Sequence, residues 1–559
     1  MSTTHQPDTS GMTCAGLLIR LLRETYGVDL VFGIPGVHTV ELYRGLSGSG
    51  IRHVTPRHEQ GAGFMADGYA RASGKPGVCL IITGPGMTNI ATAMGQALAD
   101  SIPMLVISSV NRRDTLGCGQ GRLHELASQQ QLMAGVARFS HTLLDAANLP
   151  ALLARAFAVF QGERPGPVHI EIPIDLFAAP APAAISVEPA RLYPPSPAPE
   201  GIALAADWLR QAERPLVLLG GGCIDAQDTA RALVERLDAP VVVTINAKGI
   251  LGRDHPLDLG ANAALSAVRR LAAAADVILA VGTELGETDY DVVFDDGFAL
   301  TGKLIRIDLD AQQLVRNQSL ALGLVGDAQQ GLAQLLEHFP RPLSKAGAER
   351  TARALAELAL TDNPDFASFV PLYEVLHDAL PDAILVGDST APVYAGNHLV
   401  SQPAPRRYFN ASTGYGTLGY GLPAALGATF ARPDLPVVAL VGDGGVMFTL
   451  SELATAVEEH LPVVILLWHN AGYEEIRRFM DASGVERLGV DILAPDFLAV
   501  AQGFGCAAAR VGSPADLAQA LAGRPLDAPL MIVVDASAWQ QSLARQGSIS
   551  ALHRWSGSR

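Results

Sequence analysis

The sequence predicts an α/β protein built from three doubly wound parallel-sheet domains. Short apolar runs of the kind that form buried parallel strands recur along the chain, and helical stretches separate them. Several runs end in a glycine-rich turn, as Leu30 to Phe32 does before Gly33 to Gly36. A length of 559 residues suits about three such domains.

The first domain is expected at residues 1–180. Leucines at helical spacing from Leu17 to Leu22 predict an opening helix that ends near Gly27. The strands of this domain are predicted at Leu30 to Phe32, near Val54, and at Val78 to Ile82, Met104 to Ser108 and Val168 to Ile172.

Residues 181–200 are rich in Pro and Ala without a period and predict a linker. A central domain is expected at 201–345 and, after a second linker near Thr361 to Asp365, a third domain at 360–545. The apolar runs in these two domains are Leu216 to Leu219, Val241 to Thr244, Val277 to Val281, Leu304 to Ile307, Ile384 to Val386, Val437 to Val441 and Val463 to Trp468.

Charge and composition narrow the class of partner. The net charge of −16 and the absence of a long basic run argue against a nucleic-acid or anionic-membrane surface. The N-terminal residues lack the apolar core of a signal peptide, and no apolar run approaches the roughly 18 residues of a membrane span. We therefore expect a cytoplasmic protein that acts on a small molecule.

Five cysteines are scattered without a CxxC pair, so we expect neither a disulfide framework nor a zinc site. We predict that all of them are buried small residues, namely Cys14, Cys79, Cys118, Cys223 and Cys506.

Two neighbouring strands of the third domain end in polar, glycine-bearing turns. Asp443 lies in the turn GDGG after one strand, and Asn470 lies in HNAG after the next. Because parallel strands end at the same sheet edge, these two side chains can meet. Together with a carbonyl near Gly472 and a bound diphosphate, they would provide the oxygen ligands that Mg²⁺ prefers. The amides of Gly444 and Gly445 can turn toward phosphate, although Gly-Asp-Gly alone could be a simple strand-to-helix turn.

Two further loops of the third domain carry candidate binding groups. The turn after Ile384 to Val386 presents Ser389 and Thr390, whose hydroxyls could reach diphosphate oxygens. A formal GxGxxG runs from Gly414 to Gly419, and a dinucleotide site was weighed for it. That alternative fails because the acidic candidate, Asp434, precedes the next strand rather than following it.

In the first domain, Glu59 lies in the segment RHEQ before a helix rich in small residues, and Thr83 to Asn89 (TGPGMTN) follows an apolar strand. For an isolated glutamate, a first-turn carboxylate that complements the helix dipole is the better interpretation. The glycines of the second segment allow the backbone to approach a ligand closely.

These motifs together resemble the thiamine diphosphate-dependent enzymes, from residue 13 to about 535, in the domain order of acetolactate synthase and benzoylformate decarboxylase. The resemblance implies that Asp443, Asn470 and a carbonyl near Gly472 hold Mg²⁺ and diphosphate, although the family usually has Asn where this chain has His469. It also implies that Glu59 hydrogen-bonds N1′ of the cofactor pyrimidine. The other positions that it implies near the cofactor are Thr83, Asn89, Ser389, Thr390, Gly416, Leu418, Gly444, Gly445 and Tyr473, with Leu418 as the wedge that bends the cofactor.

The resemblance further implies non-oxidative decarboxylation of a 2-oxo acid, with carboligation of pyruvate as in acetolactate synthase as the alternative. The polar loop from Gly117 to Gln131 carries Leu-His-Glu where acetolactate synthases have Phe-Gln-Glu, so His124 is a candidate catalytic imidazole or, with equal weight, a solvent-facing loop residue. His38 and His469 are the other imidazoles near the expected site. A homologue that keeps the fold without catalysis is the alternative from another class.

Among these enzymes the chain most resembles bacterial 2-ketoarginine (5-guanidino-2-oxopentanoate) decarboxylases, through FGIPGVHTVELYRGL, LHE and GTELGETDYD. A cationic substrate needs a carboxylate in its pocket. Glu474 and Glu475, which follow the predicted metal loop, are the leading candidates, and each could equally be a solvated acid. Further acids, Glu287, Asp289 and Asp291, cluster in the central domain.

Two further implications concern cofactor and assembly. The central domain lacks the Arg-Phe-Asp-Asp-Arg type of segment expected for FAD and has GTELGETDY instead, so FAD is not expected. Family members close the site by pairing two subunits, so we expect a homodimer or a dimer of dimers.

Overall fold

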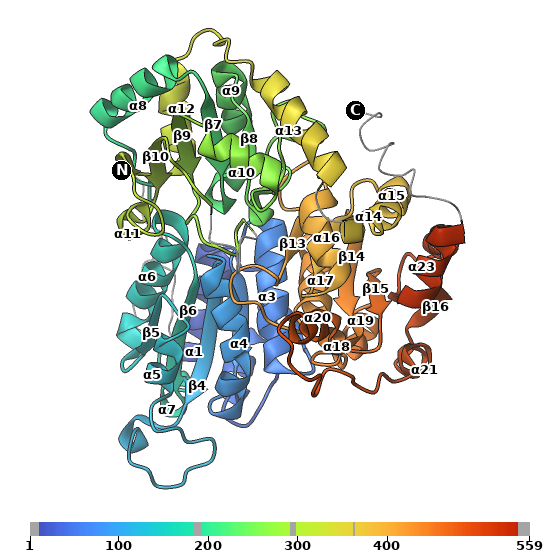
Figure 1. The fold of residues 1–559 in the computed structure, drawn as a ribbon. Helices are drawn as coiled ribbons and strands as arrows, with labels where there is room; N and C mark the ends of the chain where they lie inside the picture. The colour runs from blue at the N-terminus through green and yellow to red at the C-terminus, as the bar shows by residue number, and fades with distance from the viewer. Residues whose placement is uncertain (1–10, 183–191, 291–297, 362–363, 546–559) are drawn as a thin grey trace. The chain divides into compact units, whose positions relative to one another are not determined.

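The computed structural model describes residues 11–182, 192–290, 298–361 and 364–545 (Figure 1). Within these residues the strands form three parallel sheets with helices between them, which confirms the predicted α/β class. The chain divides into two compact units. Unit 1 comprises Met1–Tyr193, Leu422–Pro433 and Thr449–Leu461, and unit 2 comprises Pro194–Gly421, Asp434–Phe448 and Pro462–Arg559.

Unit 1 contains a six-stranded parallel sheet in the order β2-β1-β3-β4-β6-β5. Its strands are β1 (Leu30–Phe32), β2 (Arg52–Val54), β3 (Gly77–Ile81), β4 (Met104–Val110), β5 (Phe139–Thr142) and β6 (Pro167–Pro173). Its helices are α1 (Cys14–Arg20), α2 (Val40–Leu46), α3 (Glu59–Ser73), α4 (Pro85–Ala99), α5 (Gln129–Ala134), α6 (Leu149–Gly162), α7 (Ile174–Phe177), nearly all of α17 (Gly421–Ala431) and α19 (Glu452–Glu458).

The central strands of this sheet are apolar because helices cover both of their faces. Leu80 of β3 packs in a core with Leu17 of α1 and Phe157 of α6. The neighbouring Cys79 points to the other face, where its thiol donates to the carbonyl of Ala62 in α3. Alternate residues of one strand therefore serve two separate cores.

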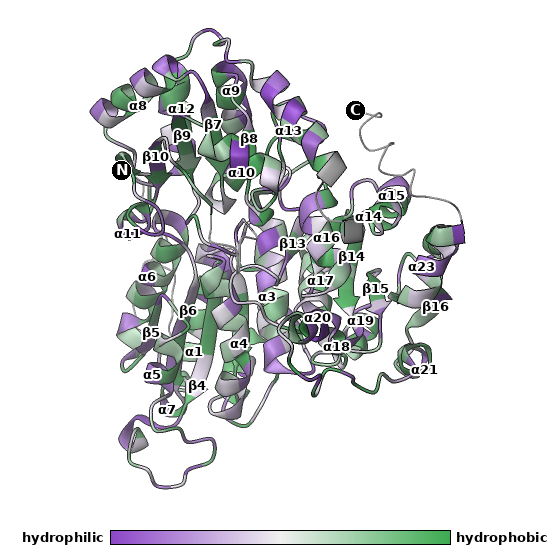
Figure 2. Ribbon diagram, in the orientation of Figure 1, coloured by the Kyte–Doolittle hydropathy of each residue, from purple (hydrophilic) through white to green (hydrophobic). Residues whose placement is uncertain are grey.

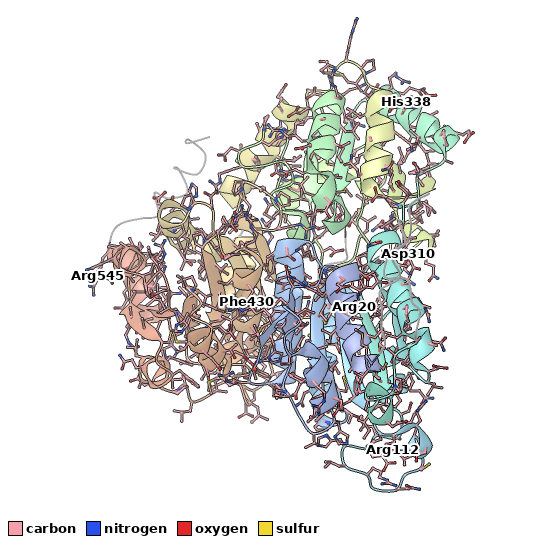
Figure 3. All side chains as sticks on the ribbon, turned by 180° about the vertical axis from the view of Figure 1, so that it is seen from behind. Arg20, Arg112, Asp310, His338, Phe430 and Arg545 are labelled. Carbon is pink, nitrogen blue, oxygen red and sulfur yellow. The ribbon has the colours of Figure 1, made fainter. Side chains whose placement is uncertain are left out.

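Helix α3 packs backbone to backbone against α17, although the two lie far apart in sequence. A Cβ atom at Gly68 would overlap the carbonyl of Ala424, and one at Gly427 would overlap the carbonyl of Met65. Phe430 of α17 is labelled in Figure 3. The guanidinium carbon of Arg52 lies over its ring, 4.8 Å from the ring centroid. Small residues thus allow a late segment of the chain to join the first sheet.

Unit 2 contains two parallel sheets, a five-stranded one in the order β11-β10-β9-β7-β8 and a six-stranded one in the order β13-β12-β14-β15-β17-β16. The first consists of β7 (Pro215–Leu219), β8 (Val241–Val243), β9 (Val277–Val281), β10 (Lys303–Asp308) and β11 (Leu322–Val325). The second consists of β12 (Ile384–Gly387), β13 (Tyr408–Asn410), β14 (Val437–Gly442), β15 (Val464–His469), β16 (Ala507–Val511) and β17 (Leu530–Asp535).

The central strands of unit 2 are strongly hydrophobic, as the green arrows of Figure 2 show for β14. The helices that connect these strands are α8 (Pro199–Gln211), α9 (Gln227–Leu237), α10 (Ser266–Ala273), α11 (Ala311–Leu314), α12 (Ala328–Glu337), α13 (Gly347–Thr361), α14 (Pro364–Ala367), α15 (Val370–Ala379), α16 (Ala391–Leu399), α18 (Asp443–Val446), α20 (Glu474–Ala482), α21 (Phe497–Gly503), α22 (Pro514–Ala522) and α23 (Ala536–Arg545).

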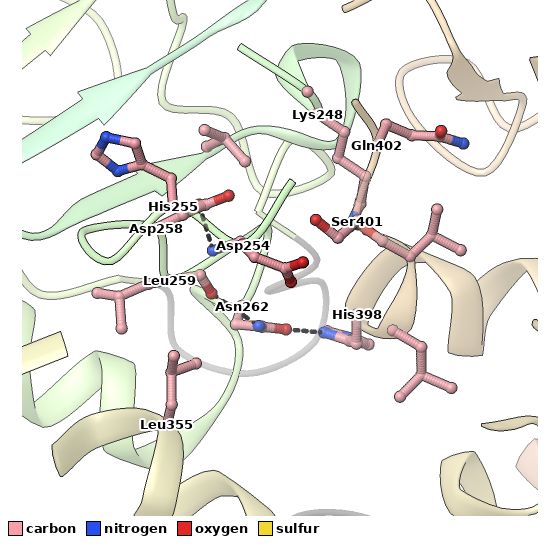
Figure 4. A pocket seen from close by; sticks show the side chains of 15 residues that line it. Lys248, Asp254, His255, Asp258, Leu259, Asn262, Leu355, His398, Ser401 and Gln402 are labelled. Atoms are coloured by element: carbon pink, nitrogen blue, oxygen red, sulfur yellow. Dashed lines mark hydrogen bonds between the residues drawn. The ribbon is translucent and has the colours of Figure 1, made fainter. Parts of the chain in front are cut away.

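A pocket lies within unit 2, between loops of the central sheet and the end of α16 (Figure 4). Lys248 is buried there and donates from Nζ to the carbonyl of Val400 at 2.9 Å. Burial lowers the pKa of Lys248 to about 8. Asn262 pairs with Nδ1 of His398 at 3.0 Å. These contacts join the central region to the third sheet.

The predicted strands occur within one or two residues of their expected ends. Five strands were not predicted, and four of them, β5, β11, β13 and β16, lie at sheet edges. Of these, β5, β11 and β16 are partly exposed, so their sequences lack a continuous apolar run. The fifth, β17, has an apolar run that was left unassigned.

Three local predictions need correction. The turn expected at GDGG is instead a short helix, α18, which begins at Asp443 itself. Asn89 lies on α4 rather than in a turn, because that helix begins at Pro85. Cys118 is exposed, whereas the other four cysteines are buried as predicted, because it lies on the polar loop that follows β4.

Within the described ranges, no helix is both long and apolar enough to cross a membrane.

Candidate active site

The predicted site residues fall into two groups, one in each unit. The Asp443 half-site in unit 2 comprises the loops that follow β12, β14 and β15, together with the loop from Ser412 to Tyr420. The Glu59 half-site in unit 1 comprises the start of α3, the start of α4, and the loops that carry His38 and His124.

Asp443 is the first residue of α18 and lies at the carboxyl end of β14. Its Oδ2 atom accepts the backbone N–H groups of Asn470 at 3.0 Å and Ala471 at 2.6 Å. Nδ1 of His469 lies 2.8 Å from the same oxygen and donates to it, since an ionised carboxylate only accepts. Among the described residues, the hydrogen bonds of this carboxylate all fall on Oδ2, so Oδ1 is the atom available to a cation.

The loop after β15 has a backbone that few residues can adopt. Ala471 has φ +59° and Gly472 has φ +149°. A Cβ atom at Gly472 would overlap the carbonyl of Val490. The ring of Tyr473 packs against Gly444, where a Cβ atom would meet ring carbon Cε1 at 2.5 Å. The two loops therefore fit together only because both positions are glycine.

A buried carboxylate, Asp388, connects two loops of this half-site. It accepts the N–H of Ser389 at 2.8 Å and that of Gly419 at 2.9 Å. Burial raises the pKa of Asp388 to about 6, and these backbone donors oppose the rise. Its neighbours Ser389 and Thr390 were predicted from the sequence, whereas Asp388 was not, although an acid that directly follows a buried strand is a usable signal.

Leu418 lies on the loop that Asp388 holds. Its side chain is half-buried, and the neighbouring Tyr415 is 57% exposed. Gly414 and Gly416 have φ values of +64° and +71°, which let the loop turn back before α17. The side chain of Leu418 is thus presented by a loop that is fixed at its base.

Glu59 begins α3 and is 9% exposed. Asn89 donates from Nδ2 to Glu59 Oε2 at 2.9 Å, so the two predicted residues meet across the starts of α3 and α4. The side chain of His58 caps α3 by accepting the N–H of Gln60 at 3.1 Å. A Cβ atom at Gly86 would lie 3.4 Å from Glu59 Oε1, so the small residue leaves that oxygen accessible.

Thr83 is part of a buried network. Its hydroxyl donates to Gln129 Oε1 at 2.9 Å, and Gly84 N–H donates to the same oxygen at 3.0 Å. Gln129 in turn donates to Glu171 Oε2 at 2.9 Å. The role of Thr83 in this structure is therefore to fix the loop, and the sequence analysis did not anticipate Gln129 or Glu171.

His38 and His124 face one another with ring centroids 5.1 Å apart. The Nδ1 atom of each ring is buried and has no hydrogen-bond partner among the described residues. Burial, followed by the proximity of His124, lowers the pKa of His38. His124 also has φ +60°, a conformation that costs a residue with a Cβ atom about 1 kcal/mol. A strained, under-bonded imidazole pair is typical of a functional site.

Glu474 and Glu475 begin α20, directly after the loop that carries Asn470 and Gly472. The carboxylate of Glu474 pairs with Arg477 at 2.6 Å and with Arg478 at 3.5 Å. Arg477 also donates to the carbonyl of Ala471 at 3.3 Å. Glu474 thus binds a guanidinium group of its own chain beside the metal loop. Of the central-domain acids, Asp291 lies outside the described residues.

The Asp443 half-site fits a magnesium diphosphate group by the chemistry of its donors. Asp443 Oδ1, the side chain of Asn470 and the carbonyl of Gly472 are hard oxygen donors, and two hydroxyls, Ser389 and Thr390, stand on the adjacent strand end. The described residues contain no cluster of three or more His, Cys, Asp or Glu side chains that could hold a metal alone. A diphosphate would have to complete the ligand set.

Models of three protein domains match this chain. They are described as the N-terminal TPP binding domain, the central domain and the C-terminal TPP binding domain of thiamine pyrophosphate enzymes, and they match residues 12–132, 202–335 and 388–534.

The chain is also similar to whole proteins. A probable 2-ketoarginine decarboxylase, AruI, from Pseudomonas aeruginosa is 48% identical over 514 residues, which cover 90% of each chain. The acetolactate synthase isozyme 1 large subunit of Escherichia coli is 31% identical over 550 residues, 94% of each chain. The acetolactate synthase large subunit of Parasynechococcus marenigrum is 32% identical and covers 88% of this chain and 82% of its own.

Proposed function

The chain belongs to the thiamine pyrophosphate enzyme family, and from this premise we propose that it decarboxylates 5-guanidino-2-oxopentanoate (2-ketoarginine) to the aldehyde and CO₂. The similarity to the probable 2-ketoarginine decarboxylase carries the substrate assignment, because it extends over nearly the whole chain. The acetolactate synthases are more distant relatives, which makes carboligation of pyruvate the weaker alternative.

The residues of the Asp443 half-site would hold Mg²⁺ and the diphosphate. Asp443, Asn470 and the carbonyl of Gly472 would bind the metal, while Gly444 and Gly445 at the start of α18 would direct amides toward phosphate. The other cofactor contacts of this half-site are assigned to Ser389, Thr390, Gly416, Leu418 and Tyr473. When bound, thiamine diphosphate would supply a nucleophilic carbon that adds to the 2-oxo group and a cationic thiazolium ring that accepts the electron pair released with CO₂.

Glu59 would share a proton with N1′ of the pyrimidine. Asn89 already donates to Glu59 Oε2, which leaves Oε1 beside Gly86 for this contact. The small exposed fraction of Glu59 keeps water from competing for the proton. Asn89, which lies near the start of α4, keeps the carboxylate in one orientation.

His38 and His124 would carry the proton that replaces CO₂ in the product. Both have a free Nδ1 atom, whereas His469 donates to Asp443 and is less suited to this role. The lowered pKa of His38 favours a neutral ring near pH 7, which suits a hydrogen bond with substrate rather than delivery of a proton. We assign the transfer to His124 and the contact with substrate to His38.

The guanidinium group of the substrate would bind a carboxylate at the start of α20, either Glu474 or Glu475. Glu474 already accepts from Arg477, so its position suits a guanidinium donor. Binding there would require the substrate to share this carboxylate with Arg477 or displace it.

We also propose that the enzyme pairs as a homodimer or a dimer of dimers, in which Glu59 of one copy serves the cofactor held by Asp443 of another. Two inactive variants, Glu59→Gln and Asp443→Asn, would then restore activity when their subunits are mixed. If the mixture were as inactive as each variant alone, a site shared between two copies would be excluded.

Steady-state assays with 2-ketoarginine, pyruvate and benzoylformate test the main proposal. The highest kcat/KM is expected for 2-ketoarginine, with CO₂ and 4-guanidinobutanal as products. Fastest turnover on pyruvate with acetolactate as product would overturn it. If thiamine diphosphate and Mg²⁺ failed to raise the melting temperature, the chain would instead be a non-catalytic homologue.

A further inference from the structure

A buried glutamate that the proposed chemistry does not use, Glu452, lies against the segment that leads to Glu59. Its carboxylate accepts the N–H of Arg57 at 3.0 Å (Oε1) and 3.1 Å (Oε2), and the N–H of His58 at 3.1 Å. Thr455, one turn later on α19, donates to Glu452 Oε2 at 2.7 Å. All of these residues belong to unit 1.

The carboxylate of Glu452 fits closely beside α3. Glu452 is 0% exposed, and a Cβ atom at Gly61 would overlap its Oε1 atom. Two backbone N–H groups at the start of α3 are paired by this one side chain, and leaving buried donors unpaired is destabilising. Glu452 is therefore the acceptor that fixes the backbone next to Glu59.

Exposed ion pairs surround this buried contact. Arg57 pairs with Glu458, and Arg52 pairs with Glu459 at 2.5 Å. Glu458 and Glu459 lie at the end of α19 in or near solvent, where ion pairs contribute little. Three carboxylates therefore hold the segment from Arg52 to His58: the buried Glu452 and the surface residues Glu458 and Glu459. All three belong to α19 or directly follow it.

We propose that Glu452 is a positioning residue for Glu59. By accepting the amides of Arg57 and His58, its carboxylate sets where α3 begins and hence where the Glu59 carboxylate points. This inference rests on the proposed role of Glu59 toward the pyrimidine. The two carboxylate oxygens divide the contacts between them: Oε1 accepts the amides of Arg57 and His58, and Oε2 accepts the Thr455 hydroxyl and shares the amide of Arg57.

Glu452→Gln tests the proposal with little change of shape. The glutamine keeps one acceptor oxygen and places an NH₂ group against an N–H or hydroxyl donor. In the protein without cofactor, amide hydrogen exchange in a peptide that covers residues 57–60 should become faster. With thiamine diphosphate and Mg²⁺ bound, exchange of the cofactor C2 proton should slow by about 10- to 100-fold, since misplacement by about 1 Å has an effect of that size.

Binding of the cofactor should change by less than about threefold, because its metal and diphosphate ligands lie in unit 2. Glu458→Gln is the matched control: it removes a carboxylate of the same helix that also contacts Arg57, yet both exchange rates should stay at wild-type values. Thr455→Val is a milder second variant, which removes one donor to Glu452 and should slow C2 exchange less than Glu452→Gln does.

Unchanged amide and C2 exchange in Glu452→Gln would overturn the proposal, as would equal effects of Glu452→Gln and Glu458→Gln. If Glu452→Gln did not fold, a wild-type C2 exchange rate in Thr455→Val would overturn it. None of these measurements requires a 2-oxo acid, so inactivity toward 2-ketoarginine would refute the substrate assignment alone.

Discussion

The two half-sites differ in what brings their residues together. In the Asp443 half-site, the neighbouring parallel strands β14 and β15 deliver Asp443 and Asn470 to one sheet edge. In the Glu59 half-site, the key carboxylate stands at a helix start whose backbone is held by Glu452, nearly four hundred residues later in the chain. The first arrangement follows from local sequence and strand order, whereas the second needs a contact between distant segments.

The largest expected effect is a loss of C2 proton exchange on substitution of Glu59, with cofactor binding at the Asp443 half-site left intact. Glu59→Gln should slow exchange of the cofactor C2 proton by about 10²- to 10⁴-fold, because the amide cannot share a proton with N1′. Cofactor and Mg²⁺ affinity, measured by calorimetry, should remain close to wild type. Normal C2 exchange in this variant would contradict the role of Glu59.

A change in the metal loop should have the opposite pattern. Gly472→Ala places a Cβ atom against the carbonyl of Val490 at φ +149° and should weaken Mg²⁺-dependent cofactor binding by about 10- to 100-fold. C2 exchange at saturating cofactor should be nearly normal. Gly484→Ala is the control, since Gly484 also has a positive φ but has open space around it. If both variants lost cofactor affinity equally, the strain of a positive φ would explain the loss, and the contact with Val490 would not be needed.

The same contrast explains what the sequence could predict. Apolar runs and the turns GDGG and HNAG were sufficient to place Asp443 beside the Asn470 loop, because parallel strands end at one edge. The resemblance implied roles for Glu59 and Thr83, but the contacts of Glu452 with the backbone before Glu59 and of Gln129 with Thr83 could not be predicted. Such contacts depend on how distant helices pack, and neither periodicity nor spacing in one sequence encodes that packing.

Asp388→Asn should have a smaller effect, confined to the Asp443 half-site. The asparagine amide would face an N–H group that the carboxylate accepted, which costs about 1–3 kcal/mol of stability. We expect a lower melting temperature without cofactor and weaker cofactor binding, because the Leu418 loop loses its anchor. A wild-type melting temperature and affinity would show that the loop is held by other contacts.

The last prediction concerns the pH dependence of stability, to which a buried acid of each half-site contributes. Burial raises the pKa of Asp388 to about 6 and that of Glu452 to about 7, above their unfolded values of 3.8 and 4.5. The folded protein therefore binds these protons more tightly than the unfolded chain does. The stabilisation is complete below the unfolded pKa values and is lost as pH rises through about 6 and 7, by up to about 3 kcal/mol per group. Urea unfolding of the protein without cofactor between pH 5 and pH 8 should show this decline. Glu452→Gln should flatten its upper part, whereas Asp388→Asn should flatten the lower part. If stability declined with pH in both variants as it does in the wild type, other groups would be responsible for the pH dependence. The titration of Asp388 and Glu452 would then no longer distinguish the two half-sites.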